Sequence, residues 1–119
     1  MTKKEKYILY KFVKYVETQL NITTPYKIKL SNNHKNFKTT AYYDDNTKTA
    51  AVYTKNRALV DVCRSLAHEL VHLMQHQNNK IHGKVKDVGG PIEDEANAVA
   101  GRLIKKFGYD HPKLKFFQH

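Results

Sequence analysis

The stretch NRALVDVCRSLAHELVHLMQHQN, residues 56–78, is the longest helical pattern in this chain. Its apolar residues recur every three or four positions, which is the period of one face of an α-helix. These residues are Leu59, Val62, Cys63, Leu66, Leu70, Leu73 and Met74. The stretch therefore predicts an amphipathic helix with Cys63 in the core. His68 and His72 lie on its other face, one turn apart.

A second helical pattern opens the chain. Residues 3–20 predict an amphipathic helix that ends near Asn21, with Pro25 as a stop. Apolar side chains recur at every fourth position, namely at Ile8, Phe12, Val16 and Leu20.

Strand patterns fill the segment between the two helices. Residues 26–30 alternate apolar and basic side chains, as a half-buried strand does. Residues 39–43 and 49–54 predict two further strands, and the turn signal Asp44-Asp45-Asn46-Thr47 separates them. We therefore expect an antiparallel hairpin beside the first strand.

After a loop at residues 79–90, Pro91 is suited to open another helix, since the first helical N–H needs no partner. Gly108 is the expected end of this helix, and no structure is predicted for residues 109–119. The pattern predicts a single α+β domain over residues 1–119. It comprises an N-terminal helix, a three-stranded, mostly antiparallel sheet, the long helix and a C-terminal helix.

Composition limits the class of protein. The 119 residues have a formal net charge of +10, with nine lysines against two glutamates in residues 1–38. A solvated lysine-rich surface is the favoured interpretation, although such basic ends could also bind nucleic acid.

No apolar run is long enough to cross a membrane. With Cys63 as the only cysteine and no signal peptide, we expect a cytoplasmic protein. The many Lys, Asn and Tyr residues suggest an AT-rich genome, such as that of a phage.

The motif His68-Glu69-Leu70-Val71-His72 carries the clearest chemistry. Two histidines four residues apart on a helix can bind one metal ion together. Glu69 points to the side of that ion and can reach a bound water. Zinc lowers the pKa of such a water. The glutamate then accepts the proton of the water while the water attacks a carbonyl. The motif thus predicts a zinc-dependent hydrolase with Glu69 as the general base.

A catalytic zinc needs a third protein ligand. Glu93 is the favoured candidate, because Asn97 shares its helix face and could hydrogen-bond a ligand histidine. Glu95 is an alternative that points away from Glu93 on an ideal helix. His82 is another alternative, in the following loop, whereas His76 falls a turn past the metal.

These two segments resemble the gluzincin metallopeptidases, and in particular the ImmA/IrrE-like peptidases of phages, mobile elements and bacteria. The resemblance rests on the motif at 68–72 and on Glu93-Asp94-Glu95-Ala96-Asn97. It implies a zincin-like fold in which His68, His72 and Glu93 bind zinc and Glu69 is the base. Asn97 stands where the family more often has Asp. The implied substrate is a peptide or protein, bound along strand 49–54 as the sheet edge.

Other functions stay open at this point. A resemblance to SprT-like proteases, which act on DNA-linked proteins, would make His82 the third ligand. A non-catalytic zinc-binding regulatory module is a third interpretation, although Glu69 would have no purpose there. The transition-state oxyanion would also need a donor, and the candidates are Tyr42, Tyr43, Tyr109 and His111.

Overall fold

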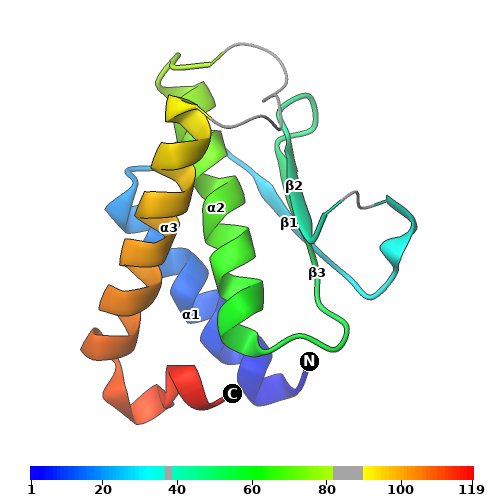
Figure 1. Cartoon of the computed structure of the whole chain (residues 1–119), viewed down its shortest axis with the longest axis vertical. Helices are drawn as coiled ribbons and strands as arrows, with labels where there is room; N and C mark the ends of the chain where they lie inside the picture. The colour runs from blue at the N-terminus through cyan, green and yellow to red at the C-terminus, as the bar shows by residue number, and fades with distance from the viewer. Residues whose placement is uncertain (37–38, 82–89) are drawn as a thin grey trace.

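The computed structural model describes residues 1–36, 39–81 and 90–119 (Figure 1). The helices and strands are α1 (Lys3–Gln19), β1 (Lys27–Ser31), β2 (Ala41–Asp44), β3 (Thr49–Tyr53), α2 (Leu59–Gln77) and α3 (Pro91–Asp110). Short 3-10 turns lie at His34–Asn36, Pro112–Leu114 and Phe116–Gln118. The predicted α+β class and the order of its elements are confirmed. Each helix within the described residues is too short or too polar to cross a bilayer.

The sheet is mixed, with strand order β1-β3-β2. β2 and β3 form the predicted antiparallel hairpin, whose turn Asn46 supports by donating its N–H to the Asp44 carboxylate at 2.9 Å. β1 pairs in parallel with β3, with Lys27 opposite Thr49. The expectation of a mostly antiparallel sheet did not include this pair. The strand at 49–54, expected at the edge, is the central one, so that expectation is wrong.

Helix α2 is the centre of the molecule (Figure 1). It contacts α1, α3, β2 and β3, and Figure 1 shows it between α3 and the sheet. Its apolar stripe is buried as predicted, including Cys63. Burial raises the pKa of the Cys63 thiol. Ala96 and Ala100 are the first buried residues of α3. Because these side chains are small, the start of α3 can approach α2 closely.

The end of the chain differs from the prediction. α3 continues past Gly108 to Asp110, so Gly108 is not its end. A Cβ on Gly108 would lie 2.2 Å from the ring of Phe117, so a larger residue there would displace that exposed ring. The last 3-10 turn thereby folds back against α3 and places Phe116, 2% exposed, in the core.

Candidate metal centre

The second half of α2 and the first turn of α3 bring three potential metal ligands together. His72 Nε2 lies 2.7 Å from Glu93 Oε1, and His68 Nε2 lies 3.3 Å from Glu93 Oε2. The two histidine Nε2 atoms are 3.1 Å apart. One ligand atom from each residue fits within 4.8 Å of the other two. The metal-binding motif and the third ligand favoured from sequence therefore form one group.

The spacing of these atoms fits a divalent metal ion. Metal–nitrogen bonds of about 2.0–2.1 Å in a tetrahedral site place neighbouring ligand atoms about 3.4 Å apart. The separations of 2.7 to 3.3 Å are close to this value, so small side-chain movements would make room for an ion. His68, His72 and Glu93 could therefore hold such an ion.

Local structure explains why these side chains converge. His68 and His72 are four residues apart on α2, and their rings meet edge to face with centroids 4.7 Å apart. Glu93 lies in the first turn of α3, where the helix dipole favours a carboxylate. Side-chain exposure is 4% for His72 and about one fifth for His68 and Glu93. The group is thus sheltered on the His72 side and open on the other.

The environment of His68 favours its neutral form. Burial lowers the pKa of His68, and the neighbouring His72 lowers it further. The Glu93 carboxylate and a side-chain hydrogen bond from His68 to Asn97 act in the opposite direction. The net effect is a lowered pKa, and neutral imidazole is the form that binds metal. Asn97 is thus close enough to influence the pKa of His68.

Gln75 is a part of the site that the sequence analysis missed. Its side chain is fully buried, and its Nε2 donates to the Ile92 carbonyl at 3.0 Å and to Glu95 Oε1 at 2.8 Å. Its Oε1 must therefore accept from His72 Nδ1, which lies 2.7 Å away. A proton on Nδ1 leaves His72 Nε2 with its lone pair directed toward His68 and Glu93. The i,i+3 spacing of His72 and Gln75 was the available sequence signal.

Glu95, the other described candidate for a third ligand, has different partners. Glu95 receives hydrogen bonds from Gln75 and from Lys80, and these two contacts lower its pKa. It supports Gln75 rather than joining the group of three. His82 is outside the described residues.

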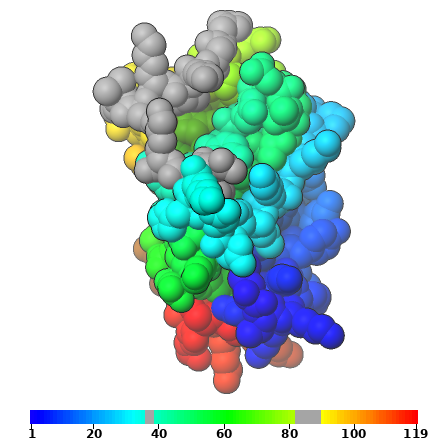
Figure 2. Space-filling view, turned by 90° about the vertical axis from the view of Figure 1, so that its right-hand side faces the viewer, coloured from blue at the N-terminus to red at the C-terminus, as the bar shows by residue number. Residues whose placement is uncertain are grey.

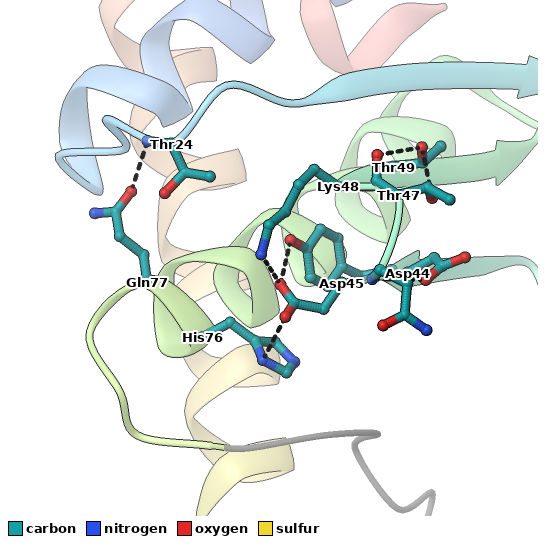
Figure 3. A network of polar contacts seen from close by, with 10 residues as sticks. Thr24, Asp44, Asp45, Thr47, Lys48, Thr49, His76 and Gln77 are labelled. Atoms are coloured by element: carbon teal, nitrogen blue, oxygen red, sulfur yellow. Dashed lines mark hydrogen bonds and ion pairs between the residues drawn. The ribbon is translucent and has the colours of Figure 1, made fainter.

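His76 belongs to a separate network at the end of α2 (Figure 3). Its Nδ1 lies 3.6 Å from Asp45 Oδ2, and Asp45 Oδ1 accepts hydrogen bonds from Lys48 and Tyr43. This network fastens the β2–β3 turn to α2. Gln77 links the end of α2 to the segment between α1 and β1, because its Oε1 accepts a hydrogen bond from the backbone N–H of Thr24 at 3.0 Å.

Three of the four oxyanion candidates are engaged or remote. Tyr43 donates its hydroxyl proton to Asp45. Tyr109 follows Glu93 by sixteen residues on α3, or about 24 Å at the helical rise. The His111 ring packs on Phe107, with centroids 4.3 Å apart, at that same far end. Tyr42 is the neighbour of Tyr43 on β2, so its side chain projects from the opposite face of the sheet, away from α2.

β2 runs beside the segment of α2 that carries His68 and His72. At one end the hydroxyls of Thr40 and Ser65 are 3.2 Å apart, and Ser65 precedes Glu69 by one turn. At the other end the rings of Tyr43 and His76 lie 5.6 Å apart. The side of β2 that faces away from β3 has no strand partner in residues 1–36, 39–81 and 90–119. The free sheet edge next to the histidines is therefore β2 and not β3.

Replacing Gln75 by leucine should weaken zinc binding by roughly tenfold or more, since His72 loses the acceptor that orients it. A competition titration with a chromogenic chelator would measure the affinity. Gln77→Leu is the matched control, because it removes an amide on the same helix that contacts Thr23, Thr24 and Asn21 instead. Equal zinc affinities in the two variants would contradict a role for Gln75 in orienting His72.

Comparison of this chain with protein-family models, with curated proteins and with solved structures found no match. The site is therefore interpreted from its own geometry.

Proposed function

We propose that this protein is a zinc-dependent peptidase of the gluzincin type, with His68, His72 and Glu93 as zinc ligands. The observation that carries the proposal is the convergence of these three side chains next to Glu69. Two imidazole nitrogens and one carboxylate oxygen are a common donor set of catalytic zinc, and a fourth position stays open for water or substrate. Since Glu93 completes the group, a gluzincin of the ImmA/IrrE type is favoured over a SprT-like protease.

Glu69 is the proposed general base for peptide hydrolysis at this site. When bound, zinc would act as a Lewis acid that polarises the substrate carbonyl and lowers the pKa of a water molecule toward neutral pH. Glu69 follows His68 directly on α2 and is only 9% exposed, so its carboxylate is in sheltered surroundings. We assign it the role of accepting the proton of the attacking water and passing it to the leaving amine.

β2 is the proposed support for the substrate. A peptide that adds to its free edge would run along α2 between Ser65 and His76, past the two histidines. Backbone hydrogen bonds would then hold the scissile bond at the metal with little dependence on side-chain sequence. We further propose a cytoplasmic enzyme, consistent with a single buried, unpaired Cys63.

Metal content tests this proposal directly. Wild-type protein purified without added metal should contain about one zinc per chain, and Glu93→Ala should lose most of it. Elemental analysis for zinc and iron is the measurement, since iron(II) enzymes also use two histidines and one carboxylate. Asp94→Ala is the matched control, because Asp94 is the next residue in the same turn and is exposed. Zinc retained in Glu93→Ala would overturn the ligand assignment, and iron in place of zinc would overturn the proposed chemistry.

A further inference from the structure

A second concave surface lies away from the metal centre, between α1 and β1. It is a groove of about 540 Å³ with an apolar floor that includes Leu9, Val13, Ile28 and Leu30. Figure 2 shows the atoms of α1 in dark blue beside the lighter blue segment that contains β1. Leu30 is 38% exposed although it is a large apolar residue. The groove thus offers apolar contact area next to a strand.

The outer edge of β1 is open along this groove. Among the described residues, β1 pairs with β3 alone. The Lys27 N–H donates to the Lys48 carbonyl and the Ser31 carbonyl accepts from Thr54, both on the β3 side. Since successive residues of a strand direct their backbone groups to opposite edges, those of Ile28 and Leu30 point outward. An extended chain could pair with these backbone groups.

The charges around the edge are positive. Lys6 lines the groove, and Lys27 and Lys29 project from the opposite face of β1, because side chains alternate along a strand. No carboxylate within residues 1–36, 39–81 and 90–119 forms an ion pair with any of these three lysines. Glu17, which also lines the groove, is paired with Lys14 at 3.6 Å.

We propose that this groove binds an extended acidic segment of another protein, which adds to β1 as an outer strand. The segment would alternate in character. Its apolar side chains would cover Ile28 and Leu30 on the groove side, and its acidic side chains would face Lys27 and Lys29 on the other. This surface is separate from the metal centre, so the proposal does not depend on the proposed peptidase activity.

Two other occupants fit the surface less well. A second copy of this chain would place its own Lys27 and Lys29 against the first pair, and like charges on neighbouring strands repel. A nucleic acid would neutralise the lysines, but it would leave the outward backbone groups of Ile28 and Leu30 without partners. An acidic strand satisfies the charges, the apolar floor and the backbone together.

A short capped peptide that alternates valine and glutamate is the probe. Fluorescence anisotropy of the labelled peptide with the wild-type chain should give saturable binding at low salt. A proline in the middle of the peptide should abolish this binding, because it removes an N–H and blocks the added strand. Hydrogen exchange of the Ile28 and Leu30 amides, followed by NMR, should slow when the peptide is bound. Mass spectrometry of the recovered peptide checks that it stays intact.

The double variant Lys27→Glu, Lys29→Glu should bind the peptide about tenfold more weakly or worse. Lys105→Glu, Lys106→Glu is the matched control, because these exposed lysines on α3 change the net charge equally. Leu30→Glu is a second test of the groove if the double variant fails to fold.

Three results would overturn the proposal: absence of saturable binding, equal weakening in the two double variants, or unchanged exchange at Ile28 and Leu30. Tighter binding of single-stranded DNA than of the peptide, with the same dependence on Lys27 and Lys29, would assign the surface to nucleic acid instead.

Discussion

Replacing Glu69 by glutamine is expected to slow peptide hydrolysis by roughly 10²–10⁴-fold and to leave the zinc content unchanged. Glutamine keeps the size and polarity of the side chain but cannot accept a proton at neutral pH. Glu69 is not one of the three clustered ligands, so the metal should stay bound. Cleavage of a quenched fluorescent peptide library and elemental analysis of the same samples would measure the two effects separately.

Asp61→Asn is the matched control for this experiment. It makes the same chemical change on the same helix, two turns before Glu69, at a half-exposed side chain that pairs with Arg64. Its activity should equal that of the wild type. A Glu69→Gln variant with wild-type activity would show that Glu69 is not the base. A zinc-loaded wild type that cleaves no peptide would favour the non-catalytic zinc module.

Replacing Phe116 by alanine is expected to lower the free energy of unfolding by about 3–5 kcal/mol. The Phe116 ring stacks on Phe12 with centroids 5.7 Å apart and meets the edge of Phe107 at 5.0 Å. These neighbours belong to α1 and α3, so they cannot easily move together to fill the space that the ring leaves. Urea unfolding followed by circular dichroism would measure the loss.

Phe117→Ala provides the comparison. Phe117 is the next residue but is 54% exposed, so its removal should change the free energy of unfolding by about 0.5 kcal/mol. Equal losses in the two variants would mean that the C-terminal turn is not part of the core.

The sequence predicted the helices well because their signals are local. α1 and α2 begin and end within three residues of the expected positions, and Asn79 has a positive φ of 59° just past the end of α2. The parallel pairing of Lys27 with Thr49 was not predicted, because it joins residues far apart in the chain. Phe116 was missed because the basic tail has no regular period, and its buried position depends on packing against Phe12 and Phe107 from two distant helices.

The residues of the site also divide into those with a local sequence signal and those without one. His68 and His72 were recognisable from their spacing on one helix, and Glu93 from its place in a second helix. Gln75 was missed because its spacing from His72 is a weak signal by itself, and the contacts with Ile92 and Glu95 that fix its amide come from another helix. Contacts between elements, rather than patterns within them, carry the information that the sequence analysis lacked.

His68 and His72 come from α2, whereas Glu93 comes from α3. A bound ion would thus join two helices that come together only in the fold, and it would bind the folded protein more tightly than the unfolded chain. By mass action, each tenfold rise of free metal above the dissociation constant would add about 1.4 kcal/mol to the free energy of unfolding. Metal supply would then govern how much of this protein persists in a cell, before any substrate is met.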